Sequence, residues 1–198
     1  MNNKDIICRL RKELDFKRYE HTCGVAYTSA ALAMRWDADV DKAYISGLLH
    51  DCAKCLDDDK KIAICKKHNI SITEVEKRNP FLLHAKAGSF LAMNKYKVHD
   101  SDVINAILNH TTGRPGMSLL EKIIFVADYI EPGRKKAPNL AEIREMAFIS
   151  LDGAVVKILK DTLDYLKSTP GEIDPMTQKT YDYYCELYNT AVTEKKED

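Results

Sequence analysis

Residues 47–55 read GLLHDCAKC and place a histidine and an aspartate side by side, directly after Gly-Leu-Leu. Apolar residues recur at helical spacing through residues 40–54, which predicts a helix that enters the core. His50 and Asp51 lie at the edge of its apolar side. Polar groups at the entrance to a core need partners there. We therefore searched the rest of the chain for other polar residues on apolar helix faces.

The helical periodicity continues along the whole chain, and no convincing run of alternating polar and apolar residues indicates a strand. We predict an all-α protein, a single-domain helical bundle over residues 1–198. The predicted helices cover residues 3–15, 19–36, 40–54, 58–69, 81–97, 102–111, 117–130, 139–166 and 175–194. Asn139 is a predicted N-cap with Glu142 as its return partner, and Asp174 a predicted N-cap before Pro175.

The composition excludes several classes of partner. Thirty Lys and Arg residues balance thirty Asp and Glu residues, so the basic excess typical of proteins that bind nucleic acid or anionic membranes is missing. The first residues, MNNKDIICRLRKEL, are charged and do not resemble a secretory signal, and no apolar run approaches the length of a membrane span. We expect a cytoplasmic protein, and a homodimer is compatible with the composition.

The chain has six cysteines, which we expect to be buried thiols rather than disulfides. Cys52 and Cys55 have the C-x-x-C spacing of zinc and thiol-redox sites. However, no second such pair completes a four-thiolate zinc site. Small residues facing the core are the better interpretation of both.

Two further helices carry polar residues on apolar faces. His21 shares a helical stripe with core residues, and Asp128 follows Ile-Ile-Phe-Val-Ala. An unpaired buried carboxylate would cost roughly several kcal/mol, and a metal ion is one of the few sufficient partners. Together with His50 and Asp51 they offer two imidazoles and two carboxylates. This set suits Fe, Mn, Co or Zn, whereas Mg would prefer oxygen ligands only.

His84 and His110 also lie on apolar stripes. They could complete a second metal position bridged by Asp51, or bind phosphate directly. Taken singly, each is also compatible with a hydrogen-bonded structural histidine. His68 and His99 have charged neighbours, and we interpret both as surface residues.

The order His21, His50-Asp51, Asp128 on helices resembles the HD superfamily of metal-dependent phosphohydrolases over about residues 18–134. The stretches HDCAK, LLHAKAG, ILNHTTGRPGMSLLEKIIFVADYIEPGR and GEIDPMTQKTYDYY are similar to its YqeK branch, the symmetrical bis(5′-nucleosyl)-tetraphosphatases. This resemblance covers most of the chain. It implies that the helices over 139–194 complete the bundle and the nucleotide pocket.

The resemblance further implies hydrolysis of diadenosine tetraphosphate into two ADP, with bound iron held by His21, His50, Asp51 and Asp128. A divalent ion makes hydroxide available at neutral pH, so water would attack a phosphoanhydride. By resemblance alone, the base and ribose would contact a late turn made of Pro170, Gly171, Glu172, Ile173, Asp174 and Pro175. The family usually has a histidine where this chain has Asp174, which puts a nucleotide contact of that side chain in doubt.

Other side chains are candidates for the phosphates and for proton transfer. Lys54 lies on the same helical face as Asp51, Arg134 follows the Pro-Gly break after the helix of Asp128, and Arg18 precedes His21 by one turn. Each is also compatible with a solvated surface cation. Asp51 or a neighbouring histidine could take the proton of water. His110 with Thr111 could donate hydrogen bonds to phosphate, and His84 could do the same or protonate the leaving oxygen.

Two alternatives remain at this stage. Another HD-type phosphohydrolase would act on a nucleoside monophosphate, a guanosine polyphosphate or a cyclic dinucleotide. A non-catalytic nucleotide-binding helical module belongs to a different class, and it would be expected to have a broken metal set. Every expected ligand is present in this chain.

Overall fold

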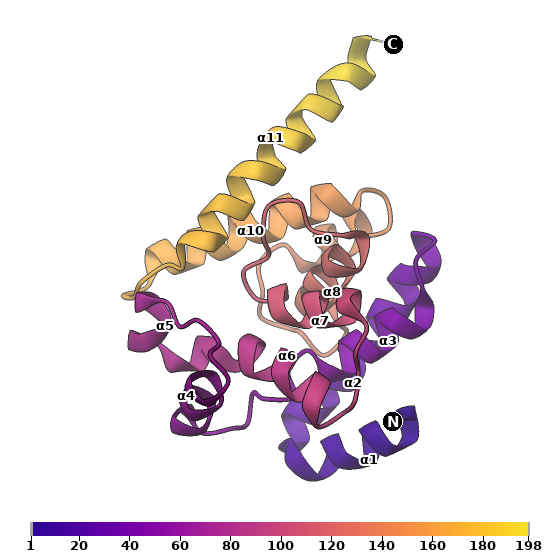
Figure 1. Cartoon of the computed structure of the whole chain (residues 1–198). Coiled ribbons are helices and arrows are strands. Elements are labelled where there is room, and N and C mark those ends of the chain that lie inside the picture. The colour runs from indigo at the N-terminus through magenta and orange to yellow at the C-terminus, as the bar shows by residue number, and fades with distance from the viewer. Residues whose placement is uncertain (1, 198) are drawn as a thin grey trace.

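The computed structural model describes residues 2–197, with side chains up to residue 190. Within this range the chain forms α-helices and one 3-10 helix but no strand, which confirms the predicted all-α fold class (Figure 1). The helices are α1 (Asn3–Glu13), α2 (Phe16–Arg35), α3 (Val40–Leu49), α4 (Asp58–Lys67), α5 (Glu74–Arg78), η1 (Pro80–Leu83), α6 (His84–Asn94), α7 (Ser101–Asn109), α8 (Leu119–Ile130), α9 (Leu140–Met146), α10 (Leu151–Ser168) and α11 (Pro175–Glu197).

Local sequence signals set several of these boundaries. The side chains of Asp15 and Asp39 cap α2 and α3 by accepting backbone N–H groups of the first turn. Ser118 and Glu121 form a capping box at the start of α8, in which each side chain accepts the backbone N–H of the other residue. As predicted, α11 begins at Pro175, and Asp174 accepts the N–H of Met176.

The helix predicted over residues 40–54 is too long, because α3 ends at Leu49. The N–H groups of Cys52 and Lys54 bond to the carbonyl oxygens of Leu49 and Asp51, at 3.1 and 2.9 Å. These bonds reach back three residues, so the chain tightens into consecutive turns. His50 and Asp51 therefore lie on a turn at the helix end rather than inside a helix.

The single helix predicted over 139–166 is wrong, since α9 and α10 are separate. Ser150 caps α10 by accepting the N–H of Gly153 at 3.2 Å. The carbonyl of Ala147, at the end of α9, accepts the indole N–H of Trp36 at 2.9 Å. No glycine or proline marks this break in the sequence.

The predicted side-chain cap at Asn139 is also wrong, because this residue has a left-handed backbone with a φ of 54° and makes no cap hydrogen bond. Its amide instead donates to the carboxylate of Asp161 on α10. The short helix α5 was not predicted. Thr73 and Glu76 form a capping box around its first turn.

The core lies around α8, which packs against α2, α3, α7 and α10. Ile123, Ile124 and Val126 of α8 are fully buried. Helices α2 and α3 approach closely, because a Cβ added at Gly47 would lie 2.6 Å from Cα of Ala26. Contacts also join α3 to α7 and α8, so α2, α3, α7 and α8 form one packed group.

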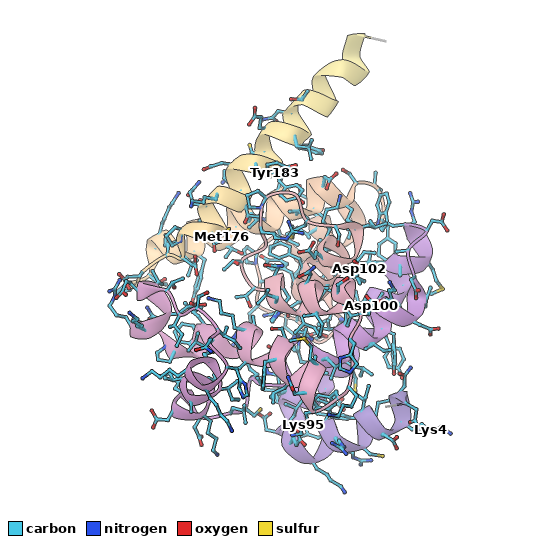
Figure 2. The ribbon with its side chains drawn as sticks, in the orientation of Figure 1. Lys4, Lys95, Asp100, Asp102, Met176 and Tyr183 are labelled. Carbon is cyan, nitrogen blue, oxygen red and sulfur yellow. The ribbon has the colours of Figure 1, made fainter. Side chains whose placement is uncertain are left out.

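Two surface features complete the fold. Lys42 of α3 forms ion pairs with Asp100 and Asp102 at the start of α7, both labelled in Figure 2. Helix α11 packs on α10 through its first part, where Met176 and Tyr183 lie, and then extends beyond the body of the molecule (Figures 1 and 2). None of the described helices is long and apolar enough to cross a membrane.

Candidate metal centre

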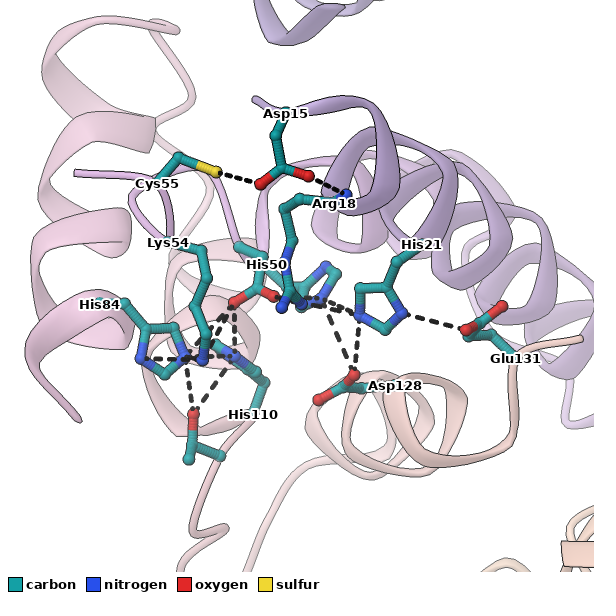
Figure 3. Close-up of polar contacts among 12 residues, drawn as sticks. Asp15, Arg18, His21, His50, Lys54, Cys55, His84, His110, Asp128 and Glu131 are labelled. Carbon is teal, nitrogen blue, oxygen red and sulfur yellow. Dashed lines mark hydrogen bonds and ion pairs between the residues drawn. The ribbon is translucent and has the colours of Figure 1, made fainter. Parts of the chain in front are cut away.

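Four histidines and two aspartates converge between the central helices (Figure 3). His21 comes from α2, the His50-Asp51 pair from the turn after α3, and Asp128 from α8. His84 is the first residue of α6 and His110 directly follows α7. The structure thus brings together all six residues that the sequence singled out from apolar helix faces.

Three of the histidines share one hydrogen-bonding pattern. In each, Nδ1 lies within hydrogen-bonding distance of a backbone carbonyl oxygen three residues earlier. These pairs are His50 with Gly47 at 2.7 Å, His84 with Phe81 at 2.8 Å, and His110 with Ile107 at 2.7 Å. A carbonyl can only accept, so Nδ1 carries the proton and the neutral ring presents the lone pair of Nε2. All three Nε2 atoms face the centre, as metal ligands would.

Asp51 lies between two groups of histidines. Its Oδ2 is 3.6 Å from Nε2 of His50 and 4.0 Å from Nε2 of His21. Its Oδ1 is 3.3 Å from Nε2 of His84 and 3.6 Å from Nε2 of His110. Oδ1 is buried and accepts no hydrogen bond from the described residues. A buried carboxylate oxygen without a donor is suited to a cation.

Asp128 closes the first group. Its Oδ1 lies 3.0 Å from Nε2 of His21 and accepts a hydrogen bond from Nη2 of Arg134 at 2.8 Å. The side chain keeps 24% of its surface exposed, so it is less buried than its apolar neighbours in the sequence suggested. It faces both the cluster and solvent.

These donors fit a metal ion. Ligand atoms of His21, His50 and Asp51 lie within 4.8 Å of one another, as do those of Asp51, His84 and His110. Mixed imidazole and carboxylate donors suit Fe, Mn, Co or Zn. The two overlapping sets share Asp51.

The HD-domain sequence profile matches residues 18–133, which include His21, His50, Asp51 and Asp128. This chain belongs to the HD-domain family. The resemblance predicted from the sequence is confirmed, and HD domains are metal-dependent.

The symmetrical bis(5′-nucleosyl)-tetraphosphatase of Bacillus subtilis (strain 168) is 37% identical over 92% of this HD-domain chain and 97% of its own. The enzyme of the same name from Staphylococcus aureus (strain NCTC 8325 / PS 47) is 36% identical, and the match covers 89% of this chain and 91% of that one. A crystal structure of a predicted HD superfamily hydrolase involved in NAD metabolism, from Clostridium acetobutylicum, has a TM-score of 0.91. It is 40% identical and the match covers 94% of this chain and 98% of that one.

Glu131 is a residue of this HD domain that the sequence interpretation missed. Its Oε1 accepts the Nδ1–H of His21 at 3.1 Å, and its Oε2 accepts the N–H of Gly133 at 2.5 Å. The side chain is buried, and a Cβ at Gly24 would lie 2.5 Å from Oε2. Glu131 thus orients the fourth histidine, where the other three use backbone carbonyls. The sequence marked Glu-Pro-Gly only as a helix break.

The protonation states of the HD-domain cluster suit a cation. Burial lowers the pKa of His50 to about 4 and that of His84 to about 3, so both rings are neutral at pH 7. Burial would raise the pKa of Asp51, but the neighbouring imidazoles of His50 and His110 hold it well below its usual range. Burial also opposes ionisation of Asp128, but its contact with His21 outweighs burial and lowers the pKa. Both carboxylates are anionic at neutral pH.

Lys54 adjoins the second group of histidines (Figure 3), and the hydrogen-bonding distances place Thr111 there too. Nζ of Lys54 is 3.1 Å from Nε2 of His84 and 4.0 Å from Oδ1 of Asp51. Oγ1 of Thr111 is 3.2 Å from Nε2 of both His84 and His110. The predicted phosphate-binding candidates on this side therefore do lie at the cluster.

A pocket of about 910 Å³ opens on the other side, next to His21. Arg18 and Arg134 line it, and Nη1 of Arg18 donates to Oδ2 of Asp51 at 2.6 Å. The late turn at residues 170–175 is not joined to the cluster by any hydrogen bond or ion pair among the described residues. Its Glu172 pairs instead with Arg78 of α5, at 2.7 Å.

The two cysteines of the C-x-x-C spacing have different environments. Cys52 is buried in the core, as predicted. Cys55 is exposed, so the prediction that both face the core is wrong for it. Its thiol donates to Oδ2 of Asp15 at 3.4 Å. The turns after α3 point the two side chains in different directions. The expectation of six buried thiols is also wrong for Cys8, which is exposed, although all six cysteines are free.

Proposed function

We propose that this protein hydrolyses diadenosine tetraphosphate symmetrically and releases two ADP. The observation that carries this proposal is the complete HD ligand set, with every Nε2 directed inward, in a chain similar over nine-tenths of its length to enzymes named for this activity. A module that only binds nucleotides would have no need of an intact set.

We assign the metal to His21, His50, Asp51 and Asp128, whose two imidazoles and two carboxylates suit Fe, Mn, Co or Zn, and iron is the metal we favour because the family resemblance implies it. A divalent ion held there would acidify water and neutralise charge on phosphate. Asp51, His84 and His110 form the second set, which could hold another ion or bind phosphate directly.

The protein's own groups position the phosphate chain. Arg18 and Arg134 both reach the cluster from the pocket side, and Lys54 and Thr111 reach it from the opposite side. Phosphoryl transfer needs mainly alignment and charge neutralisation, which these donors supply. Because Nδ1 of His84 bonds to Phe81 and Nδ1 of His110 bonds to Ile107, the Nε2 atom of each acts as an acceptor or ligand rather than as an acid or a donor to phosphate.

In the reaction, the oxygen of water bonds to a phosphorus next to the central bridging oxygen. The bond between this phosphorus and the bridging oxygen breaks. Asp51 or a neighbouring histidine takes a proton from the water. The departing ADP carries the bridging oxygen away. The contacts of base and ribose with Pro170, Gly171, Glu172, Ile173, Asp174 and Pro175 stay a proposal based on the family resemblance.

The test is an anaerobic assay with Fe(II), Mn(II) or Co(II) and diadenosine tetraphosphate, followed by ion-exchange separation of the products. Two ADP molecules are the expected products. AMP plus ATP would contradict symmetrical cleavage. No turnover with any of the three metals would direct attention to other nucleotide substrates of HD phosphohydrolases.

We also propose that the enzyme works in the cytoplasm, because all six of its cysteines are free thiols.

A further inference from the structure

The pocket beside His21 has an excess of positive charge. Its lining includes Lys17, Arg18, Arg134, Lys135 and Lys136. The lining carboxylates are Glu20 and Glu131, and Glu131 is already bound to His21 and Gly133. The whole chain has equal numbers of basic and acidic residues, so this concentration of cations is local. A pocket of this kind selects an anionic ligand.

The cations of this pocket are available to a ligand. Lys17, Lys135 and Lys136 are exposed and form no ion pair with the described residues. Nε of Arg134 is buried and has no hydrogen-bond partner in the part of the chain that the structure describes. Arg18 and Arg134 also bind the two carboxylates of the metal cluster. These two arginines therefore connect the pocket to the reacting centre.

Phe16 adds an aromatic surface to the same pocket. It is the first residue of α2, it lines the pocket, and 80% of its surface is exposed. An exposed phenylalanine beside a cluster of cations can stack on a nucleobase whose phosphates meet those cations.

Resting on the proposed function, we infer that this pocket binds one nucleoside diphosphate half of the substrate. Symmetrical cleavage places two phosphates on each side of the broken bond, so each half needs a site of its own. Arg18 and Arg134 contact the phosphates nearest the centre, Lys17, Lys135 and Lys136 contact the phosphate beyond, and Phe16 stacks on the base. The other half lies on the side of His84, His110 and Thr111.

The test compares two pocket variants with two matched controls. Phe16→Ala removes the stacking surface, and its control is Tyr27→Ala, another exposed aromatic of α2 that lies outside the pocket lining. The double variant Lys135→Glu/Lys136→Glu reverses the charge, and its control is Lys66→Glu/Lys67→Glu, an exposed lysine pair on α4. The measurements are KM and kcat for diadenosine tetraphosphate, and the inhibition constant of inorganic pyrophosphate, which has no base.

Phe16→Ala should raise KM about tenfold, as for loss of one stacked base, with kcat and pyrophosphate inhibition within about twofold of the native values. Phe16→Trp, which keeps an aromatic surface, should have a KM close to the native value. The double lysine variant should raise both KM and the pyrophosphate inhibition constant, whereas both controls should resemble the native enzyme. An unchanged KM in Phe16→Ala, or an equal rise in Tyr27→Ala, would overturn the assignment.

Calorimetry with ADP on the metal-loaded protein separates this inference from the proposed function. Weaker binding at one ADP site in Phe16→Ala supports the pocket even if the native enzyme does not release two ADP. If ADP binding is unchanged in Phe16→Ala while the native enzyme cleaves the substrate symmetrically, the pocket assignment is wrong and the proposed function stands.

Discussion

Oε1 of Glu131 lies 3.1 Å from Nδ1 of His21, on the side of the imidazole opposite the metal ligand atom. The carboxylate is fixed in turn by the N–H of Gly133. A carboxylate behind a metal-binding histidine sets the orientation of the ring and makes its other nitrogen a stronger donor to the metal. We therefore propose that Glu131 is a positioning residue that would act on a bound metal through His21.

Glu131→Gln keeps the shape of the side chain but removes its charge. We expect a loss of about 10- to 100-fold in affinity for Co(II), because partners behind a ligand typically contribute this much. The measurement is an anaerobic titration that follows the visible absorption of bound Co(II). Glu145→Gln, at an exposed position of α9, is the control. Equal Co(II) affinities in the two variants would show that Glu131 has only a structural role.

Asp128→Ala should abolish tight metal binding and activity while the helix content stays close to native. The side chain is partly exposed and its partners are His21 and Arg134, so its removal leaves no buried cavity. Circular dichroism and metal analysis of the purified variant check both parts. Full activity in this variant would refute the ligand assignment.

Two glycines of the close-packed helices should respond differently to alanine. A Cβ at Gly47 would overlap backbone atoms of Ala26, so Gly47→Ala should lose roughly 1–3 kcal/mol in the free energy of unfolding. A Cβ at Gly24 meets the end of the Glu131 side chain, which can turn away from His21. Gly24→Ala should therefore lose metal affinity with a smaller loss of stability. Urea unfolding and Co(II) titration of both variants test this contrast, which would fail if both lost only stability.

Lys54→Ala should retain the metal but lower kcat by roughly 10²- to 10³-fold, the range for removal of one charge-stabilising donor. The lysine lies at the second group of histidines, where phosphate charge must be neutralised. Lys60→Ala, an exposed lysine on α4, is the control for a general loss of positive charge. A kcat within twofold of native in Lys54→Ala would make it an ordinary surface lysine.

Glu121 should contribute stability that depends on pH. Burial alone would raise its pKa, but hydrogen bonds from Arg114 and from the N–H of Ser118 outweigh burial and lower the pKa below its usual value. Such a carboxylate contributes fully above its unfolded pKa, about 4.3, and the contribution is lost as pH falls through the lower folded value.

Glu121→Gln should therefore cost about 1–3 kcal/mol of unfolding free energy at pH 7. Its difference from the native protein should shrink as the pH falls below about 4. Urea unfolding from pH 7 to pH 3 measures this, and a difference that stays constant over the range would contradict the assignment.

The helical periodicity predicted most of the elements, because each helix buries an apolar face that recurs in the sequence. The same logic singled out His21, His50 and Asp128 as candidate metal ligands, because they are polar residues at such faces, and the structure brings them together. The turn after Leu49 and the break before Ser150 were missed because neither contains glycine or proline. Glu131 was missed for a different reason. Its role depends on contact with His21, 110 residues earlier in the chain, and local spacing carries no information about that contact.

The position of Asp51 between two groups of histidines has a consequence for metal stoichiometry. One carboxylate offers Oδ2 to His21 and His50, and Oδ1 to His84 and His110. Ions in the two positions would share this ligand, so their binding free energies are linked. By thermodynamic reciprocity, if the first ion changes the affinity for the second by some factor, the second ion changes the affinity for the first by the same factor. If both sets bound an ion, the number of ions per chain would depend on the free metal concentration, and the occupancy of one set would alter that of the other.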